Sequence, residues 1–255
     1  MKTSDEMVLK YAVRYKDTGQ ISLPNGVYNY EIYDSEKRLK ENTEKITDWR
    51  YADSGGKLTY KTDKYGFRNE FDIDTIGDYA VALGCSITFG TAQYEHERYT
   101  TYLEQKIGMP IYNMGINASN DQVSLHNLLW LLSNFKPPKL IIFQHSGKDR
   151  VAMPSVHDEN SILLCGPWVS MFNDYFKDLD PFWTLSDQYL ISDLRYRMVK
   201  DQLKNACKNI KLVAFDGIKL HNTNQLDYGR DLHHCGPLHN EYMANEIFKL
   251  IGETE

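Results

Sequence analysis

The chain has 255 residues, of which 42% are hydrophobic, and this length suits one large α/β core with additions better than two separate domains. A net charge of −6, with no basic block and no basic–aromatic repeat, excludes nucleic acid as an expected partner. The first residues contain no apolar stretch of signal-peptide length, and no apolar run approaches the roughly 18 residues of a membrane span. We therefore expect a cytoplasmic protein, with residence on a larger particle or release by another route as alternatives.

The cysteines and histidines predict neither a disulfide scaffold nor a metal site. The four cysteines include no C-x-x-C pair, which is the spacing that zinc sites and redox motifs commonly use. His233, His234 and His239 cluster in the sequence, but their spacing is typical of a loop and no carboxylate-rich helix accompanies them. We expect no metal and no other cofactor.

The N-terminal part, residues 1–77, is polar and rich in tyrosine. Turn signals occur at Pro24-Asn25-Gly26 and at 54–56, and the pattern around Gly56–Arg68 predicts a pair of strands. We interpret residues 1–77 as an extension packed on a main domain at 78–255.

Strands and helices alternate through the main domain. Strands are expected at Tyr79–Leu83, Pro110–Asn113, Lys139–Gln144 and Lys211–Asp216. Helices are expected at Tyr99–Gly108, Gln122–Phe135, Asp193–Asn209 and Glu241–Ile251. This alternation predicts a parallel sheet with helices on both faces, a three-layer α/β/α sandwich whose functional site lies at the carboxyl ends of the strands.

A candidate nucleophile follows the first of these strands. The apolar run Tyr79–Leu83 ends at Gly84, and Ser86 stands two residues later, before a helical pattern. A strand, a glycine turn, a serine and a helix form a geometry that presents an exposed nucleophile. The second glycine stands at Gly90, so the motif differs from the G-x-S-x-G elbow of the α/β-hydrolases. An ordinary turn serine is the alternative interpretation of Ser86.

An insertion at about 150–192 interrupts the alternation and is rich in aromatic residues. The aromatic residues are Trp168, Phe172, Tyr175, Phe176, Phe182, Trp183 and Tyr189. Long insertions of this kind commonly shape a pocket, where the rings would stack on sugars or line an acyl site. Packing of an additional subdomain is the alternative.

A candidate base and its partner lie near the C-terminus. Asp231 and His234 are three residues apart in a segment that also contains Gly236 and Pro237. A serine hydroxyl needs a neighbouring base, and the base needs an acceptor that fixes its tautomer. Ser86, His234 and Asp231 have the side chains for these three roles. In the alternative interpretation Asp231 caps its own loop and His234 is a buried histidine with satisfied hydrogen bonds.

The two blocks together resemble the SGNH hydrolases, also called GDSL esterases, over most of the span 78–250. In that family a G-D-S block is often followed by T-F-G, and here Gly84-Cys85-Ser86 and Thr88-Phe89-Gly90 occupy these places. The last family block is D-x-x-H, often followed by G-P, which Asp231–Pro237 matches. The resemblance implies a three-layer α/β/α fold with a Ser-His-Asp triad made of Ser86, His234 and Asp231.

The middle blocks of the family are altered in this chain. Ala118 stands where the family has a glycine whose amide donates to the oxyanion, and Lys148 replaces an asparagine donor. The resemblance thus implies an oxyanion hole formed by the amides of Ser86 and Ala118 together with Lys148. An alanine keeps this donor if its loop does not require positive φ. A solvated lysine at a loop end is the alternative for Lys148, and the other candidate donors are Asn117, Asn120 and Gln144.

These features predict a serine hydrolase of carboxylic esters. The family acts on small acyl esters, lipids and O-acetylated carbohydrates, and the aromatic insertion favours a carbohydrate acetyl ester. Two alternatives remain. One is a degenerate relative that binds a glycan or a protein partner without catalysis, and the other is an acyltransferase that uses the same triad.

Overall fold

Four parallel strands form the central sheet in the order β6–β5–β7–β10. The computed structural model describes residues 13–29, 34–46, 51, 58–154, 160–166, 186–223 and 225–253. The four strands are β5 (Ala80–Leu83), β6 (Ile111–Asn113), β7 (Leu140–His145) and β10 (Lys211–Asp216). They lie where the apolar runs of the sequence predict them.

The strand β5 lies inside the molecule because its residues face apolar layers on both sides. All four of its residues are fully buried. Ala80 and Ala82 belong to one hydrophobic cluster, and Val81 and Leu83 belong to another, as the two-residue period of a strand requires. An uninterrupted apolar run is typical of a parallel strand that is covered on both faces.

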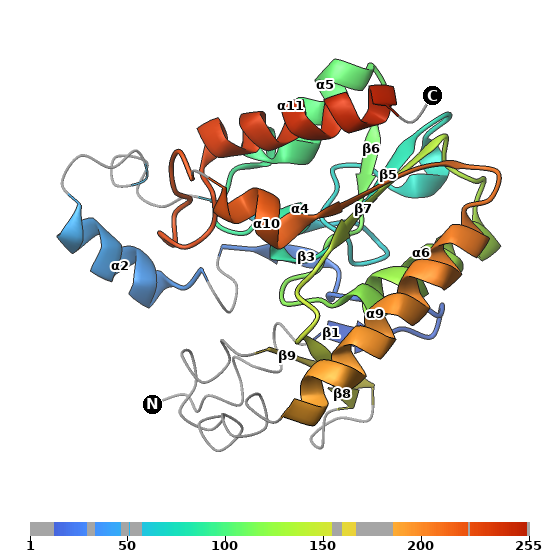
Figure 1. Cartoon of the computed structure of the whole chain (residues 1–255). Helices are drawn as coiled ribbons and strands as arrows, with labels where there is room; N and C mark the ends of the chain where they lie inside the picture. Colours follow the sequence, from blue (N-terminus) through green and yellow to red (C-terminus); the bar gives the residue numbers. More distant parts are fainter. Residues whose placement is uncertain are drawn as a thin grey trace.

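Pairs of helices cover the two faces of the sheet. Helices α5 (Tyr99–Ile107) and α11 (Pro237–Glu253) pack together on one face, and α6 (Asp121–Asn134) and α9 (Ser186–Ala206) pack together on the other (Figure 1). The predicted three-layer α/β/α architecture is therefore confirmed. Helix α11 begins earlier than predicted because the Asp227 carboxylate accepts hydrogen bonds from two N–H groups in its first turn.

The strand order places a switch point between β5 and β7. The chain passes from β5 to β6 on one side, and then returns to β7 on the other side of β5. In open parallel sheets, ligands bind in the crevice at the carboxyl ends of the two strands that flank such a point. Residues that directly follow β5 and β7 therefore meet at one edge of the sheet.

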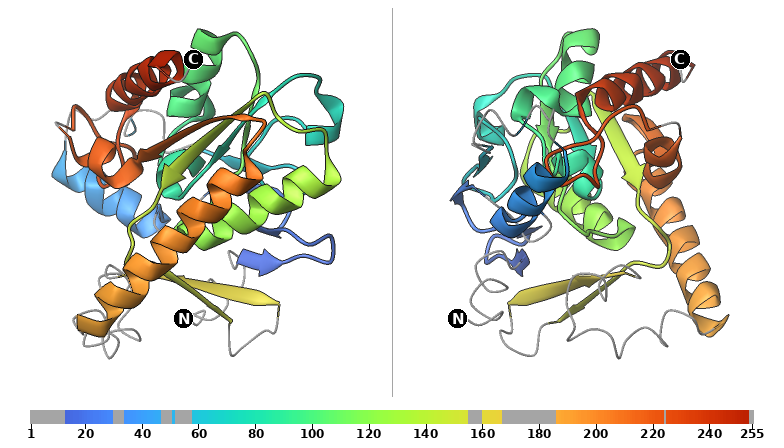
Figure 2. Two further views of the ribbon diagram at one scale, coloured as in Figure 1. Left: turned by 45° about the vertical axis from the view of Figure 1, so that its right-hand side comes forward. Right: turned by 90° about the vertical axis from the view of Figure 1, so that its left-hand side faces the viewer.

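A second, antiparallel sheet joins distant parts of the chain. It has the order β2–β1–β9–β8, and Figure 2 shows it at the end of the molecule away from α11. Its strands are β1 (Val13–Tyr15), β2 (Ile21–Ser22), β8 (Val151–Pro154) and β9 (Ser161–Cys165). The segment after Asp149 thus pairs with the N-terminal extension. The aromatic residues expected to shape a pocket lie outside the described residues, apart from the backbone of Tyr189 in α9.

The prediction that two strands around Gly56–Arg68 pair with each other is wrong. Strand β4 (Tyr60–Thr62) pairs antiparallel with β3 (Gly26–Tyr28), and residues 52–57 lie outside the described part of the chain. Local turn signals identify a hairpin between neighbouring segments, but they carry no information about a partner so far upstream.

Short elements complete the described structure. They are the helices α2 (Glu36–Lys45), α4 (Ser86–Phe89) and α10 (Gly217–Asn222), and 3₁₀ turns at Ile73–Thr75 and Glu95–Glu97. Ser35 caps α2, and Asp216 caps α10 at the end of β10. Among the described helices, none has both the length and the apolar character that a membrane span needs.

Candidate active site

Ser86 is the first residue of α4 and directly follows the turn at the end of β5. The turn is held by Gln144, whose amide oxygen accepts the N–H of Cys85 at 3.0 Å and the hydroxyl of Thr88 at 2.8 Å. A Cβ atom at Gly84 would collide with the same amide group, so the turn requires glycine. Gln144 is fully buried, and its two hydrogen bonds fix the turn that leads to Ser86.

The hydroxyl of Ser86 is recessed, and the expectation of an exposed serine is wrong. Ser86 is only 8% exposed, and the other three residues of α4 are buried as well. Its Oγ lies 3.9 Å from the sulfur of Cys85. Burial raises the pKa of this thiol, but the positive charge of Arg150 and hydrogen bonds from its neighbours outweigh burial, and the pKa is lowered.

Asp231 and His234 form a buried pair in the loop before α11. The Nδ1–H of His234 donates to Oδ2 of Asp231 at 2.6 Å, and Oδ1 accepts the N–H groups of His233 and His234 at 3.0 Å. Burial alone would raise the pKa of Asp231, but the imidazole of His234 and these N–H groups outweigh burial and lower it. An ionised Asp231 fixes the tautomer in which Nε2 of His234 is the proton acceptor.

The loop that carries this pair is docked on the segment that follows α4. The N–H of Arg230 donates to the carbonyl of Ala92 at 2.8 Å, and the side chain of Gln93 donates to the carbonyl of Cys235 at 2.6 Å. The loop of Asp231 and His234 is thus anchored to two residues that follow Ser86 closely in the sequence. These hydrogen bonds connect the loop of Asp231 and His234 to the segment that follows α4, the helix that begins with Ser86.

A buried ion pair anchors the same loop to the N-terminal part of the chain. The guanidinium group of Arg230 makes a two-pronged contact with Asp34, at 2.7 and 3.0 Å, and both side chains are fully buried. The hydroxyl of Tyr60 donates to Asp34 and accepts the N–H of Ala92 at 2.8 Å. Asn42 donates to the carbonyl of Arg230 at 3.1 Å. Sequence reasoning missed these residues because nothing in the local pattern connects Asp34 with Arg230.

Three non-glycine residues in the described structure adopt the left-handed conformation, and all three lie in loops of this site. Their φ angles are 62° at Ala92, 58° at Ala118 and 55° at Leu232. Such a conformation costs a non-glycine residue roughly 1–2 kcal/mol, and it persists where the surrounding structure enforces it. The expected condition for an alanine, a loop without positive φ, is therefore not met at Ala118. Ala118 nevertheless adopts the left-handed conformation and retains its backbone N–H, at the cost of backbone strain.

Lys148 is engaged away from the nucleophile turn, on α9. Its ammonium group lies 2.6 Å from Oδ1 of Asp193 and 4.8 Å from the ring centre of Tyr196. The side chain is 52% exposed. Lys148 would have to leave this ion pair to reach an oxyanion, and its role as a donor stays a prediction.

The two alternative asparagine donors occupy structural positions. Oδ1 of Asn117 accepts the hydroxyl of Thr91. Oδ1 of Asn120 accepts the N–H of Val123 at 3.0 Å and caps α6. The amide nitrogen of Asn120 is buried and has no hydrogen-bond partner in the described structure.

Two further histidines surround His234. The ring centres of His221 and His233 lie 6.3 and 5.3 Å from that of His234. Burial lowers the pKa of His221 to about 4 and also lowers the pKa of His233. Both rings are therefore neutral near pH 7, whereas Nδ1 of His234 pairs with the carboxylate of Asp231. Within the described residues, no three His, Cys, Asp or Glu side chains converge on a metal-binding geometry.

No protein-family model and no curated protein matches the sequence. Solved structures are similar to the chain at low identity. A protein assigned to the lipolytic G-D-S-L family from Desulfitobacterium hafniense DCB-2 matches with a TM-score of 0.38 and 13% identity, covering 68% of this chain and 99% of its own. A G-D-S-L family member from Veillonella parvula DSM 2008 matches with a TM-score of 0.35 and 16% identity, covering 68% of this chain and 99% of its own. A two-domain esterase active on acetylated mannans has the same TM-score and identity, and the match covers 69% of this chain and 50% of that one.

Proposed function

We propose that the chain is a serine-dependent hydrolase of carboxylic esters. Ser86 attacks the ester carbonyl, and Nε2 of His234 takes the hydroxyl proton and returns it to the leaving alcohol. Water, deprotonated by the same Nε2, then attacks the acyl-serine ester, which releases the acid and returns the proton to Oγ of Ser86. Asp231 orients His234 and stabilises the imidazolium that forms. The observation that carries the proposal is the 2.6 Å hydrogen bond between His234 and a buried Asp231 whose pKa is lowered.

The backbone N–H groups of Ser86 and Ala118 are the proposed donors to the oxyanion. Removal of one preorganised oxyanion donor typically lowers kcat by roughly 10²–10³-fold. The left-handed conformation of Ala118 supports the proposal, because strained backbone clusters at functional sites. Lys148 remains a third candidate.

The proposed substrate is a small acyl ester, with an acetyl ester on a carbohydrate as the first choice. The aromatic insertion and the resemblance to the SGNH hydrolases motivate this choice. A triad of the same geometry also supports acyl transfer to an alcohol in place of water. Release of acetate and formation of an acetylated alcohol distinguish the two reactions when both products are measured.

A second candidate function is binding of a glycan or a protein partner without catalysis. The ion pair of Lys148 with Asp193 and the 8% exposure of Ser86 favour it, since each reduces the number of groups that can reach a substrate. It predicts no turnover of any ester.

Turnover of p-nitrophenyl acetate tests the proposal. The parent protein should hydrolyse this ester above the buffer rate, and Ser86→Ala should reduce turnover to background because the nucleophile is removed. Cys85→Ala is the matched control and should change the rate little. Absence of turnover in the parent protein supports the binding function, and a loss confined to Cys85→Ala would identify a cysteine nucleophile.

A further inference from the structure

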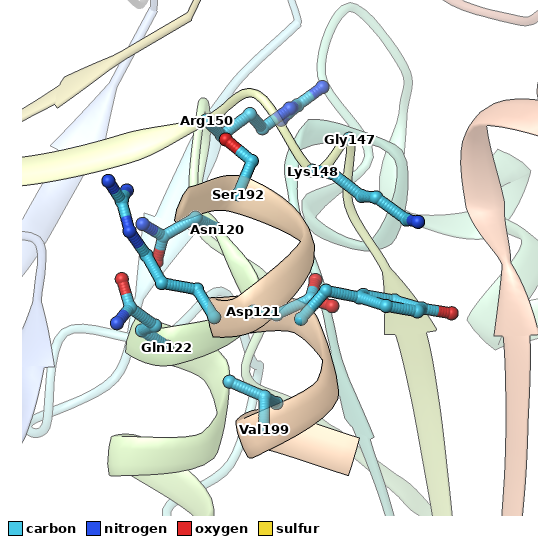
Figure 3. Close-up of a pocket in the computed structure, with 10 residues that line it drawn as sticks. Asn120, Asp121, Gln122, Gly147, Lys148, Arg150, Ser192 and Val199 are labelled. Carbon is cyan, nitrogen blue, oxygen red and sulfur yellow. The ribbon is translucent and has the colours of Figure 1, made fainter. Parts of the chain in front are cut away.

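A pocket lies beside the carboxyl end of β7, on the face of the sheet covered by α6 and α9. Its walls come from the start of α6, from the loop after β7 and from α9 (Figure 3). Its cavity volume is ≈ 20 Å³, and the pocket is otherwise open to solvent. The charged and amide side chains that line it include Asn120, Asp121, Lys148, Arg150 and Arg195.

Positive charge exceeds negative charge at this pocket. Three of the lining side chains are cations, and Asp121 is the one carboxylate among them. Both oxygens of Asp121 already accept hydrogen bonds, from Nδ1 of His145 at 2.7 Å and from the N–H of Ser146 at 2.6 Å. Asp193 pairs with Lys148, whereas Arg195 has neither an ion pair nor a hydrogen bond in the described structure. The guanidinium group of Arg195 is therefore available to a ligand.

A buried donor without an acceptor lies in the same wall. Asn120 is 3% exposed and lines the pocket, and its Oδ1 is used to cap α6, while its Nδ2 has no partner in the described structure. A buried polar group without a hydrogen bond destabilises the fold, and a ligand that supplies an acceptor would remove this cost. Asn120 also stands at the N-terminus of α6, a 14-residue helix whose dipole favours negative charge at this end.

The pocket is next to the proposed nucleophile turn. Asn120 follows Ala118 by two residues, and Nη1 of Arg150 donates to the carbonyl of Ser119 at 3.1 Å. The charge of Arg150 also acts on the thiol of Cys85, the neighbour of Ser86. A group bound in the pocket and an ester at Ser86 can thus belong to one molecule.

We propose that this pocket binds an anionic group, a carboxylate or a phosphate, through Arg195, Arg150 and the free amide nitrogen of Asn120. The identification of a substrate class rests on the proposed function: the ester that is hydrolysed at Ser86 carries such an anionic group on its alcohol portion. An acylated acidic sugar and an acylated sugar phosphate both have this chemistry.

Direct binding to the whole protein tests the pocket without any catalysis. Inorganic phosphate and glucuronate are titrated separately by calorimetry into the parent protein. Binding of phosphate alone indicates a phosphate-bearing substrate, and binding of glucuronate alone indicates a carboxylate. Binding of both supports the shared site, and binding of neither overturns the proposal.

Three variants locate the binding. Asn120→Asp keeps the oxygen that caps α6 but replaces the amide donor with a second oxygen, so the affinity for the bound anion should fall at least about tenfold. Arg195→Gln should have an effect of similar size. Lys204→Gln removes one charge from an exposed position of the same helix and should leave the affinity unchanged. Equal losses of affinity in Lys204→Gln and Arg195→Gln would show that net charge attracts the anion without a specific site, which would overturn the proposal.

A matched pair of esters connects the pocket with turnover. The preference for 4-acetoxybenzoate over its methyl ester is measured as the ratio of the two kcat/KM values, both from acetate release. Relative to the parent protein, this ratio should fall about tenfold in Arg195→Gln and stay constant in Lys204→Gln. Anion binding without turnover of either ester would refute the esterase and leave the pocket intact. Turnover of the methyl ester with no anion binding and no preference would refute the pocket and leave the esterase intact.

Discussion

The loop of Asp231 and His234 and the wall formed by α6 and α9 differ in how their arginines are paired. The loop is held by the buried ion pair of Arg230 with Asp34 and by hydrogen bonds to α2 and to the segment after α4. In the wall, Arg195 has neither an ion pair nor a hydrogen bond within the described residues. A buried and paired guanidinium group is fixed in one position, whereas an unpaired one is available to a ligand. Under the proposed function, the first region positions the base and the second receives the anionic part of the substrate.

The largest expected effect comes from the side that positions the base. Asp231→Asn should lower kcat for p-nitrophenyl acetate by about 10³-fold, because an amide cannot stabilise the imidazolium and favours the wrong tautomer of His234. The exposed Asp74→Asn is the control and should leave kcat unchanged. A loss below tenfold in Asp231→Asn would mean that the pair has a structural role alone.

The anchor of the same loop should matter for stability. Asp34→Asn leaves the fully buried Arg230 without a counter-charge, and the free energy of unfolding should fall by about 3 kcal/mol in a urea titration. Asp78→Asn breaks an exposed ion pair with Lys136 of similar length and should leave the free energy of unfolding nearly unchanged. Similar losses in the two variants would show that the Arg230 network does not hold the loop.

The histidines around His234 predict a pH dependence of stability. The pKa of His221 is lowered to about 4 in the folded chain, whereas a free imidazole has a value near ~6.5. Between these pH values the unfolded chain binds a proton at His221 that the folded chain does not bind. The contribution of His221 to the free energy of unfolding is therefore complete above about pH 6.5 and declines toward pH 4. His221→Gln should reduce the decline in unfolding free energy over this window by about 2 kcal/mol, after screening of the partly exposed ring. An unchanged slope would contradict the burial of a neutral His221.

The strained loop of Ala118 predicts that a glycine at this position increases stability. Ala118→Gly should raise the free energy of unfolding by about 1 kcal/mol, because glycine adopts a φ of 58° without the penalty of a Cβ atom. Since the N–H donor is retained, kcat should stay within about twofold. Ala244→Gly in α11 is the control and should lose stability. A loss in Ala118→Gly would show that the alanine is not strained.

The smallest effect is expected at Lys148, on the side of the pocket. Because Asp193 holds its ammonium group, Lys148→Ala should lower kcat for p-nitrophenyl acetate by less than about tenfold and change stability by less than about 1 kcal/mol. A fall of about 10²-fold in kcat with little change in KM would instead identify Lys148 as an oxyanion donor.

The central sheet and the order of its helices could be predicted from the sequence because each parallel strand is an apolar run. The strand β5 and the position of Ser86 after it follow from such a run. The recessed position of Ser86 could not be predicted, since burial of α4 depends on segments far away in the chain. The pairing of β3 with β4 and the contact of Asp34 with Arg230 are also long-range, and no local period signals them.

The candidate site also has one part that the sequence predicts and one part that it does not. The spacing of Asp231 and His234 was sufficient to predict their pairing, because both lie in one short loop. The pocket of Asn120 and Arg195 was missed because its residues come from two helices and a loop, and each has an ordinary local role. Asn120 was expected only as an alternative oxyanion donor, and the structure shows that its oxygen caps α6 while its amide nitrogen has no partner within the described residues.

The most direct test of the central claim is the site of covalent labelling by a fluorophosphonate, which reacts with an activated serine. The parent protein, Ser86→Ala and His234→Ala are incubated with the probe, and the adduct is mapped by mass spectrometry of peptides. A single adduct on Ser86 of the parent protein, absent from Ser86→Ala and strongly reduced in His234→Ala, is the predicted result. No adduct on the folded parent protein, or an adduct on a residue other than Ser86, would contradict the assignment of Ser86 as the nucleophile.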